Sequence, residues 1–207
     1  MLTQPGEKYR PYPPIALPDR RWPERQITRA PRWLSTDLRD GNQALAEPMD
    51  RARKLQFWDL LLECGFKEIE VAFPSASQTD FNFVRQLIEE RRIPQDVTIQ
   101  VLTQAREDLI LRTFESLRDA RRATVHLYNA TAPLFRERVF GMNKAQIVEL
   151  ATRATRLIRQ QCEQQPQTRW QYEYSPETFC FTEPEFALEI CEAVAEIWQP
   201  CAERPMI

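Results

Sequence analysis

The chain has 207 residues and a formal net charge of -2, from 28 basic and 30 acidic side chains. This composition is typical of a globular domain and gives no reason to expect nucleic acid or an anionic membrane as a partner. No apolar run approaches the ~20 residues of a membrane span, and the first residues lack the charged-then-apolar order of a signal peptide, so we expect a cytoplasmic protein.

The glycines and cysteines exclude several kinds of site. Only four glycines occur in the whole chain, so no G-x-G-x-x-G or Walker loop can bind a nucleotide. The cysteines contain no C-x-x-C pair, and their odd number and wide spacing indicate free, mostly buried thiols in a reducing compartment rather than a zinc or redox site. They are Cys64, Cys162, Cys180, Cys191 and Cys201.

Residues 1–30 are rich in proline and aromatic side chains. Because proline fixes the backbone and lacks an N–H donor, this segment is predicted to be neither helix nor central strand. We expect an extended N-terminal arm that lies on a surface, either of its own body or of another subunit.

From residue 31 to 207 the sequence alternates between strand-like and helix-like segments. Short apolar runs bounded by polar residues or proline predict strands, and apolar residues spaced three and four apart predict helices. A longer loop is expected after the fourth strand. The strands are expected over residues 33–36, 67–73, 97–102, 123–128 and 169–174, and the helices over 50–64, 77–88, 107–117, 143–164 and 182–198.

Several helix ends carry their own signals. Asp50 and Ser77 are suited to cap the first two helices, and Gly65 to end the first. Thr182 followed by Glu185 matches a capping box, with Pro184 in the first turn, which predicts that the last helix begins at Thr182.

The regular alternation predicts a parallel α/β sheet with right-handed crossovers. Five units of about 33 residues are too few to close an eight-stranded barrel, which would need on the order of 265 residues. Polar pairs at several strand ends favour a barrel over an open doubly wound sheet, because a barrel gathers one site there. We therefore predict a (β/α)8 TIM barrel truncated to about five βα units, in which residues 204–207 resemble the start of a sixth strand.

The stretch from Ser35 to Gln43 is the strongest candidate for a site. Arg39 beside Asp40 places a fixed cation next to a carboxylate of the kind that hard metal ions accept, and Gly41 allows the backbone to turn sharply. An ordinary salt-bridged corner between strand and loop explains the same composition equally well.

Seven segments spread over nearly the whole chain resemble the 2-isopropylmalate synthases, in the longer form found in bacteria and fungi. The likeness extends beyond the R-D-G-x-Q signature that these enzymes share with homocitrate and citramalate synthases and related lyases. The segments are residues 8–11, 17–20, LRDGNQAL at 38–45, KEIEVAFPSASQTDF at 67–81, TIQVLTQ at 98–104, VHLYNAT at 125–131 and YEYSPE at 172–177.

This resemblance implies a TIM-barrel catalytic domain that condenses acetyl-CoA with 3-methyl-2-oxobutanoate in leucine biosynthesis. It also implies a divalent metal, Mg²⁺, Mn²⁺ or Zn²⁺, and a homodimer. Asp40 matches the first metal ligand of the family. Arg39 matches a catalytic and substrate-binding cation, which would stabilise the developing enolate or alkoxide.

Further substrate-binding residues are implied on later segments. Gln43 matches a polar side chain of the Arg39 loop, and His126 matches the family's VHxYN position, although a lone strand histidine is more often a satisfied core residue. Glu173 lies on the fifth strand, and Ser175 and Thr103 are weaker candidates at neighbouring strand ends. A buried strand glutamate needs a partner in any case.

The chain also departs from the family. The remaining metal ligands come from an H-x-H pair, which a chain with one histidine cannot contain. The acetyl-CoA region and the leucine-sensing domain would also lie beyond residue 207. We therefore expect an incomplete, inactive fragment that folds weakly or self-associates. The alternatives are another acyl-CoA condensing enzyme, such as a homocitrate or citramalate synthase, and a non-catalytic assembly module.

Overall fold

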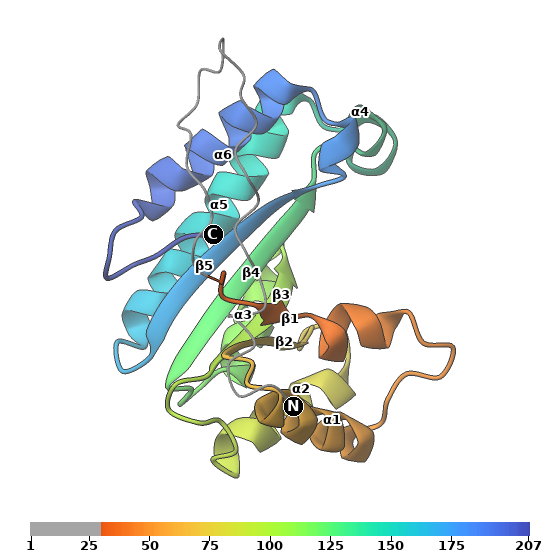
Figure 1. Cartoon of the computed structure of the whole chain (residues 1–207). Coiled ribbons are helices and arrows are strands. Elements are labelled where there is room, and N and C mark those ends of the chain that lie inside the picture. The colour runs from red at the N-terminus through yellow and green to blue at the C-terminus, as the bar shows by residue number, and fades with distance from the viewer. Residues whose placement is uncertain (1–29) are drawn as a thin grey trace, which may run out of the picture. The chain divides into compact units, whose positions relative to one another are not determined.

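A computed structural model describes residues 30–207 (Figure 1). All but the last residue of the predicted N-terminal arm lies outside this range. Residues Leu34–Ile207 form one compact unit, and every helix and strand named below belongs to it.

The unit is built on a parallel sheet whose five strands lie side by side in chain order. This order confirms the predicted alternation and argues against a doubly wound sheet, in which the strand order reverses at a switch point. The strands are β1 (Leu34–Ser35), β2 (Glu68–Ala72), β3 (Thr98–Gln104), β4 (Arg122–Ala130) and β5 (Arg169–Glu177).

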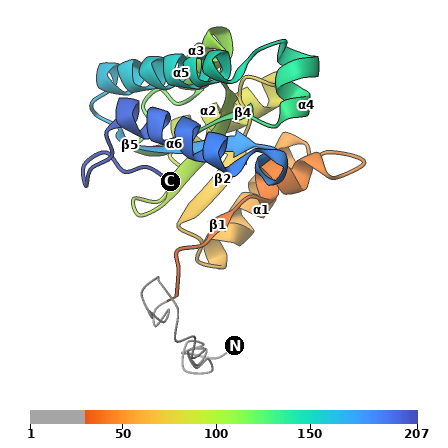
Figure 2. The same cartoon turned by 90° about the horizontal axis from the view of Figure 1, so that it is seen from above.

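Helices connect successive strands, and the sheet curls into a half-barrel with its helices packed outside (Figures 1 and 2). Right-handed crossovers between neighbouring parallel strands place each helix on the same face. The long helices are α1 (Arg51–Glu63), α2 (Gln78–Glu89), α3 (Glu107–Ser116), α5 (Lys144–Gln164) and α6 (Pro184–Trp198). Shorter helical turns are η2 (Asp37–Gly41), α4 (Pro133–Phe135), η3 (Arg136–Phe140) and η4 (Phe179–Phe181).

Most predicted helix ends are confirmed. The Asp50 side chain accepts a hydrogen bond from the backbone N–H of Arg53 at 2.8 Å, and Ser77 caps α2 in the same way. Gly65 follows α1 with a φ of +90°, a left-handed conformation that costs glycine least.

One prediction about a helix end is wrong. Glu183, not Thr182, is the residue that precedes α6, because the Thr182 hydroxyl is engaged elsewhere, 2.7 Å from the Thr131 hydroxyl. The longer loop expected after β4 is present and contains two short helical turns, α4 and η3; Pro133 at the first position of α4 favours such a turn.

The last residues continue the sheet. Met206 forms a parallel bridge with Tyr172 of β5. The Ile207 N–H donates to the Tyr172 carbonyl at 2.9 Å, and the Tyr174 N–H donates to the Ile207 carbonyl at 3.2 Å. This position is that of a sixth barrel strand, as predicted.

The sheet's helix-covered face forms the apolar core. Ile69, Ile99, Val125 and Tyr172 lie on successive strands and are fully buried there. Trp198 of α6 packs on the Tyr172 ring, with a centroid distance of 4.6 Å. Strong burial of this face is what fixes the strand register, because a slip of one residue would turn it outward.

The cysteines were predicted to be free and mostly buried. The five cysteines are free as predicted, but Cys64, Cys180 and Cys201 are exposed, so the expectation of mostly buried thiols is wrong.

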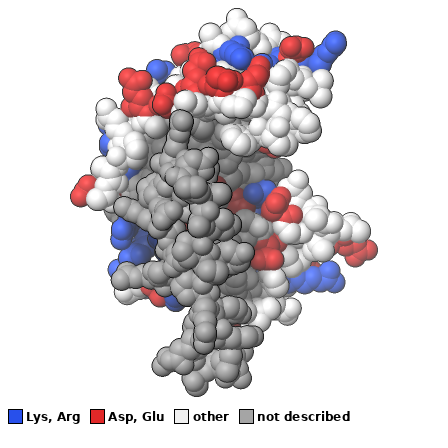
Figure 3. Space-filling view, turned by 45° about the horizontal axis from the view of Figure 1, so that its top comes forward, with Lys and Arg blue, Asp and Glu red and all other residues white. Residues whose placement is uncertain are grey.

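Within residues 30–207, no helix combines the length and apolar character needed to span a bilayer. Charges of both signs dot the face in Figure 3, and acidic side chains gather at the end that carries α6.

Candidate active site

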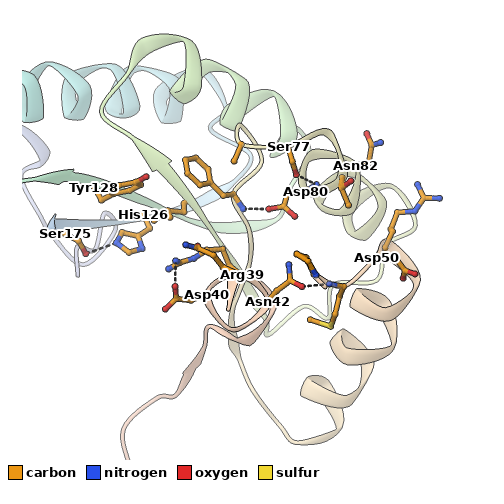
Figure 4. Close-up of a pocket in the computed structure, with 18 of the residues that line it drawn as sticks. Arg39, Asp40, Asn42, Asp50, Ser77, Asp80, Asn82, His126, Tyr128 and Ser175 are labelled. Atoms are coloured by element: carbon orange, nitrogen blue, oxygen red, sulfur yellow. Dashed lines mark hydrogen bonds and ion pairs between the residues drawn. The ribbon is translucent and has the colours of Figure 1, made fainter. Parts of the chain in front are cut away.

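A cavity of about 1050 Å³ opens at the carboxyl ends of the strands. In Figure 4, His126, Tyr128 and Ser175 lie on one side, Asp50, Asp80 and Asn82 on the other, and Arg39 and Asp40 between them. This is the end at which a barrel of this kind gathers its reactive groups, since the loops after several strands meet there. The wall also includes Asn42, Gln43, Met49, Phe73, Leu102 and Glu177.

Arg39 is fixed by two carboxylates. Its Nε and one terminal nitrogen lie 2.8 and 2.7 Å from Glu70 Oε2, and its other terminal nitrogen lies 2.9 Å from Asp40 Oδ1. The Glu70 side chain is fully buried on β2. A guanidinium held in this fork has one orientation, which a flexible ammonium would not reproduce.

Burial opposes the ionisation of Glu70, but the hydrogen bond from His126 and the charge and hydrogen bonds of Arg39 outweigh it. Together they hold the pKa of this carboxyl below its ordinary value. Glu70 therefore favours its ionised form beneath the cavity, where it pairs with the Arg39 guanidinium at the cavity wall.

A polar row continues from Glu70 across the sheet. His126 Nδ1 lies 3.3 Å from Glu70 Oε1 and 3.4 Å from Gln100 Nε2, and His126 Nε2 lies 2.7 Å from the Ser175 hydroxyl. Four strands thus contribute one side chain each to a connected network. His126 and Ser175 reach the cavity from this row, whereas Glu70 and Gln100 lie beneath it.

Glu173 extends the same row but does not line the cavity. Its Oε1 lies 3.4 Å from His126 Nε2, and among the described residues its buried Oε2 has no hydrogen-bond partner. Burial raises the pKa of this carboxyl. His126, which does line the cavity, lies between Glu173 and the cavity wall residues that it contacts.

Asp40 and Gln43 are exposed at the mouth of the cavity, the Asp40 side chain at 63%. Both stand on or just after η2, the turn that follows β1. Gly41 has no positive φ, and a Cβ built there would meet nothing closer than 3.7 Å, so the sharp turn that glycine would allow is not made at this position. The backbone instead continues through η2 as a helical turn.

Thr103 does not reach the cavity. It pairs in register with Leu127, while its neighbour Leu102 pairs with His126. Successive strand residues point to opposite faces, so the fully buried Thr103 lies on the helix side of the sheet.

The described residues do not form a metal site by themselves. No group of three histidine, cysteine, aspartate or glutamate side chains in this part of the chain is placed to hold an ion. Asp40 is one candidate ligand, and both ring nitrogens of His126 already face protein groups.

Four residues of the site were not predicted from the sequence. Glu70 and Gln100 anchor the network, and Tyr128 and Glu177 line the cavity. Glu70 could have been predicted as a site residue, because it lies in the middle of the strand-like segment 67–73 and a buried carboxylate requires a partner. Tyr128 receives a hydrogen bond from Gln104 at 2.7 Å, a contact that only the register of β3 and β4 reveals.

The far wall of the cavity is held by a buried lysine. Lys54 of α1 is 1% exposed, and its Nζ lies 2.6 Å from Asp80 Oδ1 at the start of α2. The other Asp80 oxygen accepts from the Phe73 N–H at 3.0 Å. These contacts tie α1, the end of β2 and α2 together at the cavity wall.

Comparison with known proteins agrees with this geometry. The chain is 64% identical over all 207 residues to a 2-isopropylmalate synthase of Marinomonas sp., 61% to one of Pseudomonas savastanoi and 59% to one of Ralstonia nicotianae. It spans only 36–37% of the length of these relatives. The HMGL-like family model matches residues 30–203, which include all five strands and the cavity. The chain belongs to the HMGL-like family.

Proposed function

We propose that this chain forms the 2-oxo-acid half of the active site of a 2-isopropylmalate synthase, which condenses acetyl-CoA with 3-methyl-2-oxobutanoate. The observation that carries the proposal is the coincidence of two facts. Relatives with that name match the chain from end to end, and the matched residues enclose a cavity with a preorganised guanidinium on its wall.

The proposed chemistry assigns roles to the side chains of the cavity. In the condensation, the thioester methyl gives a proton to a base, and its carbon attacks the ketone carbon of the 2-oxo acid. The ketone oxygen becomes an alkoxide that takes up a proton, and water then cleaves the thioester to release CoA. Arg39, held by Glu70, would stabilise the alkoxide oxygen as charge develops, since a fixed cation acts more strongly on the transition state than on the ground state. Ser175 and His126 would bind the substrate carboxylate.

The family resemblance implies a divalent metal, and we propose Asp40 as this chain's contribution to it. One carboxylate does not make a site, so further ligands would have to come from outside the described residues. The role of Gln43 at the mouth, and the homodimer that the resemblance implies, are likewise proposals.

A chimera tests the proposed function. Residues 1–207 would replace the matching 207 residues of the Marinomonas relative, which is 64% identical. We expect turnover of acetyl-CoA with 3-methyl-2-oxobutanoate, at a kcat/KM at least about tenfold above that with 2-oxoglutarate or pyruvate. Preference for 2-oxoglutarate or pyruvate would instead indicate a homocitrate or citramalate synthase, and a folded but inactive chimera would favour an assembly module.

A further inference from the structure

The end of β5 carries a residue in an unfavourable backbone conformation. Thr178 directly follows Glu177, the last residue of β5, and has a φ of 60° and a ψ of 35°. Glycine adopts this left-handed region readily, but a β-branched side chain is crowded there. A backbone of this kind persists only where the surrounding contacts enforce it, and such residues cluster at functional sites.

Hydrogen bonds on both sides of Thr178 enforce its conformation. The Thr178 hydroxyl donates to the Glu177 carbonyl and accepts from the Ala132 N–H at 3.4 Å. The Thr178 carbonyl accepts from the Phe181 N–H at 3.0 Å and from the Thr182 hydroxyl at 3.1 Å. Residue 178 is therefore held by the loop after β4 and by the turn at η4 together.

Glu177 is fixed by its backbone and not by its side chain. Its carbonyl accepts from the N–H and the hydroxyl of the fully buried Thr131, at 3.0 and 3.2 Å. Its carboxylate lines the cavity and, within residues 30–207, makes no hydrogen bond or ion pair. The direction in which this carboxylate enters the cavity therefore depends on the backbone at residues 177 and 178.

We propose that Thr178 is a positioning residue, whose left-handed backbone ends β5 at Glu177 and fixes the direction of the Glu177 carboxylate toward a ligand in the cavity. Thr178 does not line the cavity, so it acts through Glu177. With an extended backbone, residue 178 would lose the contacts to Ala132 and η4, and the chain would continue past Glu177 along the strand. The inference rests on the proposed function, which supplies the ligand and the reaction.

Two substitutions in the chimera separate the backbone of Thr178 from its hydroxyl. Valine keeps the crowded shape but removes the two hydrogen bonds of the hydroxyl, so residue 178 should leave the left-handed region. Glycine removes the same bonds but adopts this conformation without crowding. We expect kcat/KM with 3-methyl-2-oxobutanoate to fall about 10- to 100-fold in Thr178→Val and to stay within about threefold in Thr178→Gly. An equal fall in both variants would overturn the proposal.

A double-mutant cycle with Glu177→Ala distinguishes positioning from a general structural role. Once the carboxylate is absent, Thr178→Val should lower kcat/KM by no more than about twofold further, because Thr178 acts through Glu177. Arg91→Val is the matched control. Arg91 is also left-handed, with a φ of 53°, but it is exposed and follows α2, whose opposite end lines the cavity. This control should lower the melting temperature and leave kcat/KM unchanged.

The other outcomes are also decisive. Multiplicative losses in the cycle, or a Glu177→Ala chimera with normal kcat/KM, would overturn the role of Thr178 and leave the proposed function standing. An unmodified chimera without turnover would overturn the proposed function, and this inference with it. If Thr178→Val has no cooperative melting transition, Thr178→Gly decides, and a tenfold or larger loss of kcat/KM in the folded glycine variant would contradict the proposal.

Discussion

The two faces of the β-sheet are built from alternate residues of the same strands, yet they differ in almost every property. On β4, Val125 and Leu127 are buried under the helices, while His126 joins the polar row and Tyr128 lines the cavity. On β5, Tyr172 packs against Trp198, while Ser175 reaches His126. One face is stabilised by area removed from water, and the other by a connected set of charges and hydrogen bonds.

Substitutions on the two faces should therefore have different consequences. A change on the apolar face should cost stability wherever the chain is studied, because burial does not depend on a ligand. A change in the polar row should cost little overall stability when it preserves charge and volume, but should disturb the orientation on which a ligand depends.

The largest expected effect on stability belongs to the apolar face. Ile99→Ala removes a fully buried side chain between β2 and β4, and we expect a loss of about 2–5 kcal/mol in the free energy of unfolding. Urea unfolding of the 207-residue chain measures it. Leu111→Ala on the exposed side of α3 is the control and should change stability by less than about 1 kcal/mol.

Arg39→Lys tests the cation that pairs with Glu70 at one end of the polar row. Lysine keeps the charge but cannot make the forked contact with Glu70 and Asp40 together. In the chimera we expect kcat/KM to fall about 10²- to 10³-fold with little change in melting temperature. Arg106→Lys, at an exposed ion pair with Asp108, should keep normal kinetics. An Arg39→Lys chimera with normal kcat/KM would remove the catalytic role of Arg39.

A smaller effect on stability is expected at the ion pair between Arg136 of η3 and Glu183, the residue before α6. Two Arg136 nitrogens lie 2.9 and 2.8 Å from the Glu183 carboxylate oxygens. Arg136 lowers the pKa of Glu183 from 4.5 to about 2. Because the folded-state pKa is depressed, this pair stabilises the fold above pH 4.5, and the contribution is lost as the pH falls toward about 2. Urea unfolding across this window should show a steeper loss in the parent than in Glu183→Gln. If the free energy of unfolding falls equally with pH in the parent and in Glu183→Gln, the ion pair does not contribute to stability.

Much of the apolar face could be predicted from the sequence, and much of the polar face could not. The apolar positions of 97–102 and 123–128 reveal buried strands because burial acts on each residue separately. The partnership of Glu70 with Arg39 joins residues 31 positions apart, and the link from His126 to Ser175 joins residues 49 apart. Those contacts depend on strand register and on the turn at η2, which local composition does not encode. Thr103 illustrates the limit, since it stands at a strand end as expected but on the opposite face.

A 2-oxo acid that binds in the cavity should be detected at the chain's single histidine. If the polar row forms a 2-oxo-acid site, adding 3-methyl-2-oxobutanoate to the ¹⁵N-histidine-labelled chain should shift the His126 ring-nitrogen signals in a saturable way. The same addition to Ser175→Ala should shift them less, because that variant lacks the hydroxyl 2.7 Å from Nε2. If the ring-nitrogen signals of the parent stay unchanged at concentrations that saturate the chimera, the polar row does not form a 2-oxo-acid site.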